Sequence, residues 1–201
     1  MEHHRGHELL VGVFFGGRRR RVYTELAERS GARPGDQVLD VGCGNGYFTR
    51  VMAGAVAPGG TAVGVDPSAS SIARARQVTR AGNCTFSLGI AEDLDMEDGS
   101  VDVVVSSLML HHLPEELRAR AIGEMHRVLR PGGRLLVADF RPPASRLAGL
   151  LIAPMTSPAM RGSPMQLVEP MVGAAGFAEV HVGVARPWFA YLQAVKPGDG
   201  T

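Results

Sequence analysis

The stretch Val38-Leu39-Asp40-Val41-Gly42-Cys43-Gly44-Asn45-Gly46 decides the fold, because an apolar run ends there in a glycine-rich turn. The run predicts a buried strand over Val38–Val41, and Tyr47–Val56 has the pattern of a helix. Glycines at such a strand-to-helix turn let a ligand approach the backbone closely. The stretch therefore predicts an α/β fold with a ligand site after its first strand.

The alternation of strand and helix continues along the chain. Apolar runs predict further strands at Thr61–Val65, Cys84–Leu88, Val101–Val105 and Arg134–Ala138. Helical patterns follow at Ser68–Ala81 and Pro114–Leu129. Strands that are apolar throughout, each followed by a helix, indicate a parallel sheet covered on both faces.

The two ends depart from this repeat. We expect a helical lead-in over residues 1–31, a lid insertion over 141–165 and a terminal β-hairpin within 176–196. The hairpin strands are predicted at Ala178–Val184 and Trp188–Val195. With no internal repeat and no low-complexity linker, residues 1–201 are expected to form one domain.

A helix is expected before the hairpin. Ser163 and Pro164 have the pattern of an N-cap followed by proline in the first turn. Pro170 should disturb this helix, and Gly176 should end it.

Composition excludes several classes of protein. Of the 201 residues 45% are hydrophobic and 20% charged, unlike a disordered, collagen-like or coiled-coil chain. Twenty-one basic against 20 acidic residues leave a net charge of +1, which disfavours bulk nucleic-acid binding. The N-terminus lacks a secretory pattern, and the apolar segment 147–160 is too short to span a bilayer. Cys43 and Cys84 suffice for neither a disulfide framework nor a four-cysteine metal site, so we expect a cytoplasmic protein without a metal.

Two ligand classes fit the glycine turn: a dinucleotide pyrophosphate and the amino-acid end of S-adenosylmethionine. The third glycine of the dinucleotide fingerprint would fall at Tyr47, so that fingerprint fails. Asp40 would repel a pyrophosphate but suits an ammonium group. Asp66, which closes the second strand, can accept both ribose hydroxyls of either ligand. A purely structural turn stays an alternative, but it leaves both strand-end acids unexplained.

Five segments carry a family resemblance: VLDVGCGNG at 38–46, VGVD at 63–66, AEDL at 91–94, DGSVDVVVSSLMLHHL at 98–113 and RVLRPGGRLLVADF at 127–140. In this order the chain resembles the class I S-adenosylmethionine-dependent methyltransferases over residues 33–140. It looks most like the small-molecule subgroup with the type 11 domain, which includes the ubiquinone/menaquinone-biosynthesis enzymes. The resemblance implies a Rossmann-like three-layer sandwich, with a seven-stranded, mostly parallel sheet whose last strand is antiparallel.

The resemblance also implies a cofactor site for S-adenosylmethionine, with S-adenosylhomocysteine as product. The residues expected to line its methionine end are Asp40, Gly42, Cys43, Gly44, Asn45 and Gly46. Asp66 and Pro67 would hold the ribose. Relatives usually carry Asp or Asn where this chain has Ile90. Either the backbone of Ala91 and Glu92 then supplies the polar contacts to adenine, or the Glu92 side chain substitutes for the missing one. Ser107 matches a position that contacts the cofactor in relatives.

His111 and His112 follow the fourth strand, at the edge where such sheets bind ligands. Either can act as a base if the methyl acceptor must lose a proton, and at most one is expected to face the methyl group. The alternative is that both only pack this loop. The expected partner is a small, apolar organic molecule under a lid from residues 1–25 and 141–165.

Other acceptors and functions are less consistent with the sequence. Ser106-Ser107-Leu108-Met109 stands where enzymes that methylate nucleic-acid amino groups carry Asp/Asn-Pro-Pro-aromatic, and arsenite methylation needs more thiols than two. Arg18–Arg21 fits a solvated helix face better than a site for RNA or an anionic acceptor. Asp40 and Tyr47 argue against an NAD-dependent oxidoreductase. A catalytically idle S-adenosylmethionine-binding partner protein stays an alternative, and so does a homodimer.

Overall fold

A seven-stranded sheet lies at the centre of the molecule, with the strand order β3-β2-β1-β4-β5-β7-β6. The computed structural model describes residues 18–141, 164–185 and 189–198. The strands are β1 (Gln37–Val41), β2 (Thr61–Asp66), β3 (Cys84–Leu88), β4 (Val101–Ser107), β5 (Leu129–Phe140), β6 (Ala178–Ala185) and β7 (Phe189–Val195). The helices are α2 (Arg19–Arg29), α3 (Tyr47–Ala55), α4 (Ala69–Val78), α5 (Glu115–Val128) and α7 (Pro164–Ala174), with a short 3-10 helix η1 (Leu110–His112).

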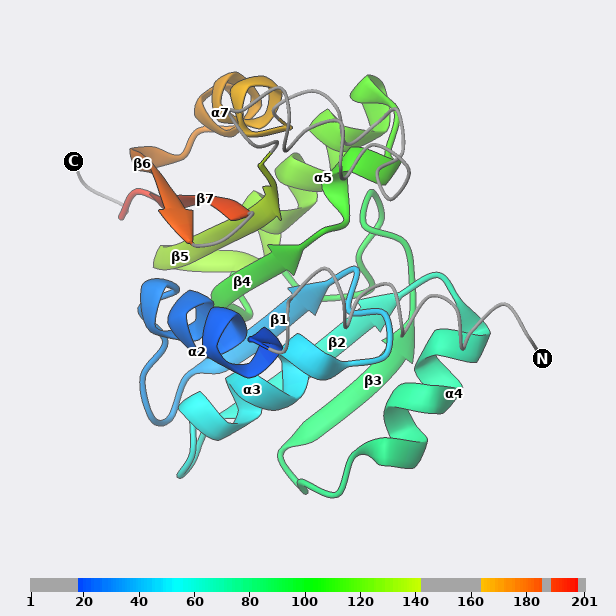
Figure 1. Cartoon of the computed structure of the whole chain (residues 1–201). Helices are drawn as coiled ribbons and strands as arrows, with labels where there is room; N and C mark the ends of the chain where they lie inside the picture. The colour runs from blue at the N-terminus through cyan, green and yellow to red at the C-terminus, as the bar shows by residue number, and fades with distance from the viewer. Residues whose placement is uncertain (1–17, 142–163, 186–188, 199–201) are drawn as a thin grey trace.

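The predicted fold class is confirmed. Strands β1 to β5 pair in parallel, whereas β7 runs antiparallel to both of its neighbours, β5 and β6. The last strand of the sequence is thus inserted between β5 and β6 (Figure 1). The predicted terminal hairpin is present, although residues 186–188, which include Trp188 and the expected turn, lie outside the described residues.

Helices cover both faces of the sheet. Val38 of β1 and its β4 neighbour Val103 pack with α2, α3 and α4, whereas the next pair, Leu39 and Val104, packs with α5 and α7. Successive residues of a strand point to opposite faces of the sheet, so a strand covered by helices on both faces is buried along its whole length. These four valine and leucine side chains are at most 1% exposed. The three layers leave the strand ends as the place for a site.

The structure corrects the predicted end of one helix and the predicted start of one strand. The helix expected over Ser68–Ala81 ends at Val78, with the Ser68 hydroxyl accepting from the Ser71 amide at 3.3 Å as its N-cap. Strand β5 begins at Leu129 rather than Arg134. Its early start follows from long-range pairing, because Leu129 is in register with Val101 of β4. Nearby, the Gly132 amide donates to the Lys196 carbonyl, and the Lys196 amide donates to the Gly133 carbonyl.

Pro170 does not interrupt its helix, contrary to expectation, since α7 continues to Ala174. Proline removes only one backbone donor, and Val168 and Val172 on either side of it are completely buried against the sheet. This packing holds the helix together. The expected lid lies almost entirely outside the described residues, and so do residues 1–17 of the expected lead-in.

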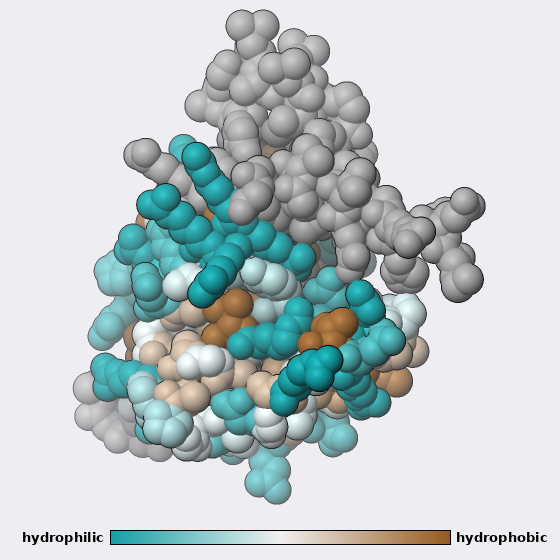
Figure 2. Space-filling model, turned by 60° about the horizontal axis from the view of Figure 1, so that its bottom comes forward, coloured by the Kyte–Doolittle hydropathy of each residue, from teal (hydrophilic) through white to brown (hydrophobic). Residues whose placement is uncertain are grey.

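The large apolar side chains that are exposed on the described part of the molecule are scattered over its surface. Figure 2 shows one face on which hydrophilic residues surround a few hydrophobic ones. The exposed large apolar side chains come from five different parts of the chain: Val78, Leu88, Ile90, Leu167, Val182 and Val184. Among the described helices, none has both the length and the apolar character needed to cross a membrane.

Candidate active site

The glycine turn after β1 is tightly packed at two of its glycines, Gly42 and Gly46, and open at the third, Gly44. Gly42, Gly44 and Gly46 all have positive φ, at 76°, 53° and 72°. A Cβ on Gly42 would lie 2.2 Å from the Met109 Cγ, and one on Gly46 would lie 2.4 Å from the Phe86 ring. A Cβ on Gly44 would meet nothing within 4 Å. Gly44 is therefore where a ligand can come against the backbone of this turn.

The end of β2 holds the turn in place. The backbone amides of Gly42 and Cys43 donate to the carbonyl of Val65 at 2.8 and 3.0 Å. The Gly44 amide donates to Asp66 Oδ2 at 2.8 Å, and the Ser68 amide donates to Asp66 Oδ1 at 2.9 Å. Asp66 thus joins the turn after β1 to the start of α4. A carboxylate has about four acceptor sites, so two remain for the ribose hydroxyls predicted from the sequence.

Asp40 lies beneath the turn and is 1% exposed. Its Oδ2 accepts a hydrogen bond from the Thr49 hydroxyl of α3 at 2.6 Å. Burial raises the pKa of Asp40 to about 7, against the opposing effect of Thr49 and with a further rise from the nearby Asp66. A cation bound near this carboxyl would favour its ionised form, which is the electrostatic behaviour that an ammonium ligand requires.

The residues predicted to contact adenine follow β3. Ile90 is 43% exposed and pairs with Asp93 in an isolated bridge, whereas Ala91 is buried and Glu92 is half-buried. The Glu92 carbonyl accepts from Arg120 of α5 at 3.5 Å. Their contact with a cofactor stays a prediction, but the structure places them beside the carboxyl end of β3, where the sequence put them.

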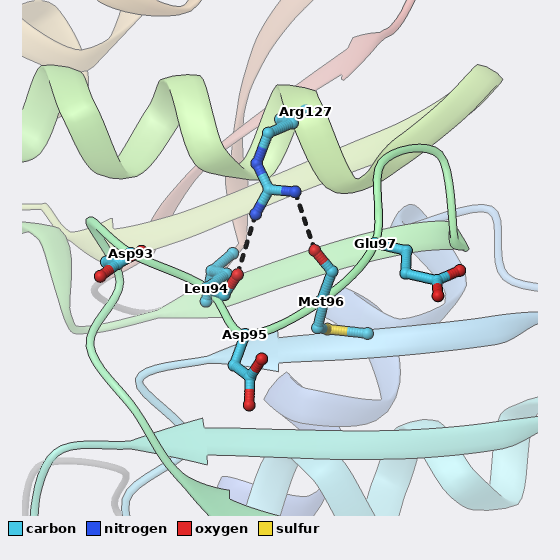
Figure 3. Close-up of a pocket in the computed structure, with 6 residues that line it drawn as sticks. All are labelled: Asp93, Leu94, Asp95, Met96, Glu97 and Arg127. Atoms are coloured by element: carbon cyan, nitrogen blue, oxygen red, sulfur yellow. Dashed lines mark hydrogen bonds between the residues drawn. The ribbon is translucent and has the colours of Figure 1, made fainter.

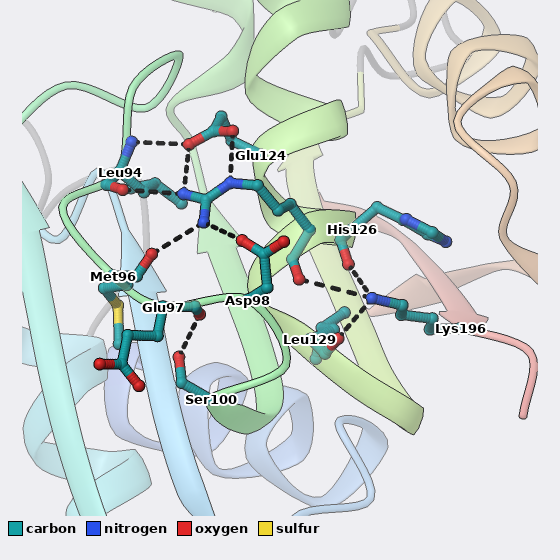
Figure 4. Close-up of polar contacts among 10 residues, drawn as sticks. Leu94, Met96, Glu97, Asp98, Ser100, Glu124, His126, Leu129 and Lys196 are labelled. Carbon is teal, nitrogen blue, oxygen red and sulfur yellow. Dashed lines mark hydrogen bonds and ion pairs between the residues drawn. The ribbon is translucent and has the colours of Figure 1, made fainter. Parts of the chain in front are cut away.

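Arg127 of α5 anchors the acidic segment that follows these residues (Figures 3 and 4). It donates to the carbonyls of Leu94 and Met96, both at 2.8 Å, and to Asp98 at 2.6 Å. Glu124 bonds both Arg127 and the Leu94 amide. The hydrogen bonds with Glu124 raise the pKa of Arg127, and those with Arg127 lower the pKa of Glu124.

A hollow of about 640 Å³ lies at this anchor, lined by Asp93, Leu94, Asp95, Met96, Glu97 and Arg127 (Figure 3). None of the residues predicted to bind the cofactor lines it. The guanidinium of Arg127 in its lining is already bonded within the protein, to the Leu94 and Met96 carbonyls and to Asp98 and Glu124. We therefore assign the hollow to the loop anchor and not to the cofactor site.

An aromatic cluster of Tyr23 from α2 with Tyr47 and Phe48 from α3 lies next to Ser107, which the sequence did not reveal. The Ser107 hydroxyl, at the end of β4, donates to Tyr23 Oη at 3.4 Å. The Tyr23 ring lies 5.3 Å from Tyr47 and 5.0 Å from Phe48, measured between centroids. Arg19 in turn lies over the Tyr47 ring, 3.8 Å from its centroid. Tyr23 thereby ties the N-terminal helix to the end of β4, a contact across 84 residues of sequence.

The two histidines have different surroundings. His111 is buried, and its Nδ1 lies 2.7 Å from Asp139 Oδ1 at the end of β5. His112 is exposed, and the two ring centroids are 4.0 Å apart. Sequence reasoning missed Asp139, which is completely buried. A signal was present, because an acid near the end of the fifth apolar run repeats the placement of Asp40 and Asp66.

These side chains meet at one edge of the sheet. Asp40, Asp66, Ser107 and Asp139 stand at or near the carboxyl ends of β1, β2, β4 and β5, which are parallel. Ligands of open α/β sheets bind at this edge. The predicted cofactor residues are therefore brought together, although their individual contacts stay predictions. In the described residues, no group of three or more His, Cys, Asp or Glu side chains could hold a metal ion.

Known proteins share this arrangement. Residues 38–133 match a family described as a methyltransferase domain. A ubiquinone/menaquinone biosynthesis C-methyltransferase from Ectopseudomonas mendocina is 37% identical over 145 residues, which are 70% of this chain and 56% of that protein. An arsenite methyltransferase from Halobacterium salinarum is 33% identical over 154 residues, 74% of this chain and 39% of that protein. The chain thus spans only part of the length of the curated relatives it matches.

The fold has solved counterparts as well. A crystal structure of an S-adenosylmethionine-dependent methyltransferase from Aquifex aeolicus superimposes with a TM-score of 0.72 at 19% identity, covering 87% of this chain and 89% of that one. The sheet order and this superposition show that the two proteins share a Rossmann-like fold. Residues 38–133 of the chain thus form a methyltransferase domain, with relatives among the ubiquinone/menaquinone and demethylmenaquinone methyltransferases.

Proposed function

We propose that this protein transfers the methyl group of S-adenosylmethionine to a small organic acceptor and releases S-adenosylhomocysteine. The observation that carries the proposal is the open side of Gly44, whose amide is held by Asp66 in the turn that follows the buried Asp40. A side chain at Gly44 would fill this space, and the match to a methyltransferase domain supports the methyl-donating cofactor as its ligand.

The residues present fit that cofactor. Asp40 favours a cation near the turn, as the α-ammonium group would be. The remaining acceptor sites of Asp66 suit ribose hydroxyls, with Pro67 beside them. Backbone groups of Ala91 and Glu92 take over the polar contacts to adenine, because Ile90 has no polar side chain. Ser107 closes the site from β4 through its bond to Tyr23.

The cofactor supplies an electrophilic methyl group, whose carbon–sulfur bonding pair stays on sulfur when the acceptor attacks. The protein's main contribution is to place acceptor, methyl carbon and sulfur on one line, since orientation alone supplies about 7–11 kcal/mol. An acceptor that carries a hydroxyl or an acidic C–H must also lose a proton. His111 and His112 stand at the edge where such a proton would be received.

The two cysteines support an organic acceptor over arsenite. Cys43 lies in the turn and Cys84 at the start of β3, and both are buried. Burial raises the pKa of both thiols, that of Cys84 to about 11, so neither supplies a thiolate at neutral pH. Two buried thiols are also consistent with a reducing, cytoplasmic setting.

The test is methyl transfer by the purified chain. S-adenosylmethionine is incubated with catechol, menadiol (a naphthalene hydroquinone, kept anaerobic) or arsenite, and S-adenosylhomocysteine is quantified. We expect product with an organic acceptor and none above background with arsenite. Binding of the cofactor without turnover of any organic acceptor would favour an idle binding partner. Absence of cofactor binding would overturn the proposal.

A further inference from the structure

The buried pair of His111 and Asp139 joins the loop after β4 to the end of β5. Its Nδ1–Oδ1 distance is 2.7 Å, and the two side chains are 4% and 0% exposed. The Phe140 amide also donates to Asp139 Oδ1, at 2.7 Å. Since a carboxylate oxygen only accepts, the proton of this contact belongs to Nδ1. The neutral ring therefore leaves Nε2 unprotonated.

Polar atoms without partners lie on the same face at the ends of these strands. Asp139 Oδ2 and Ser106 Oγ are buried and have no hydrogen-bond partner among the described residues. Ser106 is in register with Val137, and Asp139 is two residues further on, so the two side chains share one face of the sheet. Buried polar atoms are nearly always bonded, to protein, water or ligand. A polar group of a bound ligand could serve as the missing hydrogen-bond partner of these two atoms.

The two histidines are not equivalent in this respect. His111 is oriented by a carboxylate, whereas His112 is exposed and stacks on it with a 4.0 Å centroid separation. Arg118 of α5 fixes the same turn by donating to the carbonyls of Leu110 and Leu113 at 3.1 and 2.9 Å. Asp139 and His112 thus contact the His111 ring, and Arg118 holds the backbone of its turn.

We propose that His111 is the proton acceptor of the methyl transfer, with Asp139 as the positioning residue that holds its Nδ1–H and leaves Nε2 basic. This inference rests on the proposed function and adds the acceptor class, a molecule with an ionisable O–H or acidic C–H. The acceptor's proton passes to Nε2 while its electron pair forms the bond to the methyl carbon. The carbon–sulfur pair stays on sulfur, and the imidazolium, next to the Asp139 carboxylate, returns its proton to water.

The first readout needs no acceptor. Nitrogen-15 NMR of histidine-labelled protein, with the His111 signals assigned through His111→Gln, reports which ring nitrogen carries the proton. We expect the Nδ1–H form with an unprotonated Nε2 in the neutral ring. In Asp139→Asn, loss of the carboxylate should let the neutral ring populate the Nε2–H form as well. A ring protonated at Nε2 in the wild-type protein would overturn the assignment.

The second readout separates proton transfer from a structural tie. With catechol and menadiol as probes, kcat/KM of the wild type should rise with pH through one ionisation, and His111→Gln should lack this limb. Asp139→Asn should lower kcat about 10–100-fold, from the loss of a charge-assisted hydrogen bond. High pH should partly restore both variants, because the phenolic acceptor then ionises unaided. Asp95→Asn, on the exposed side of the loop anchor, is the matched control and should keep wild-type rates.

Each other outcome has a definite meaning. If both variants lose melting temperature but keep the pH limb and the rate per folded molecule, the pair is only structural and the inference is wrong. If S-adenosylhomocysteine binds but neither probe is methylated, the inference fails and the cofactor assignment stands. If S-adenosylhomocysteine does not bind, the proposed function fails as well.

Discussion

The carboxylate of Asp66 accepts a hydrogen bond at 2.8 Å from the backbone amide of Gly44, 22 residues earlier in the sequence. This contact makes the end of β2 a support for the turn after β1. One side chain is therefore expected to serve both the turn and the ribose. Replacing Asp66 should therefore affect both the stability of the turn and the affinity for the cofactor.

Asp66→Ala should lower cofactor affinity at least tenfold and also lower the melting temperature. It removes the acceptor for two backbone amides, Gly44 and Ser68, as well as that for the ribose hydroxyls. Hydrogen bonds to a charged group contribute about 1.5–3 kcal/mol each. Calorimetry with S-adenosylhomocysteine and thermal melts measure the two effects, with Asp95→Ala as control. Unchanged affinity would show that the ribose binds elsewhere.

Two glycines of the turn should respond differently to alanine. Gly42→Ala places a Cβ 2.2 Å from the Met109 Cγ, whereas Gly44→Ala meets no protein atom within 4 Å. Both changes strain a positive φ by about 1–2 kcal/mol, and overpacking adds about 1–3 kcal/mol at Gly42 alone. Denaturant unfolding should thus rank Gly42→Ala as the less stable protein. Gly44→Ala should instead lose cofactor affinity out of proportion to its stability, and equal losses of both properties in the two variants would contradict this.

Asp40 should make the stability of the cofactor-free protein depend on pH. Its folded-state pKa of about 7 lies above the ordinary value of 3.8, so the folded protein holds a proton that the unfolded chain has lost. The resulting stabilisation is complete below about pH 4 and disappears as the pH rises through about 7. In Asp40→Asn this dependence should be absent, because the amide does not titrate and can still accept from Thr49. Urea unfolding from pH 4 to 8 measures it, and parallel curves for the two proteins would refute the assignment.

Arg127→Gln should loosen the segment that follows the adenine contacts. The change leaves the carbonyls of Leu94 and Met96 without their donor and the Glu124 carboxylate without its cation. We expect faster hydrogen exchange over residues 91–98 and a threefold to tenfold loss of S-adenosylhomocysteine affinity, on the order of one hydrogen bond. Arg74→Gln, an exposed side chain bonded to Gln77, is the matched control. Exchange unchanged over residues 91–98 would mean that Arg127 does not order them.

The features predicted best from the sequence are those that are determined by the local pattern of residues. Strand β3 lies where it was expected, Cys84–Leu88, and the two histidines follow β4 as predicted. Features decided by distant partners were missed: β5 starts early because β4 and Lys196 pair with it, and α7 continues past Pro170 because its neighbours are buried. Tyr23 and Asp139 were missed as site residues for the same reason, since each gains its role from a partner far along the chain.

The central claim is the identity of the ligand at the glycine turn. Calorimetric titration of the purified protein with S-adenosylmethionine, S-adenosylhomocysteine, NAD and NADH tests it directly, with Gly44→Ala as the variant that should weaken binding. The account predicts one site for the two sulfur compounds and no comparable affinity for NAD or NADH. Tight binding of NAD or NADH, without binding of either sulfur compound, would contradict it.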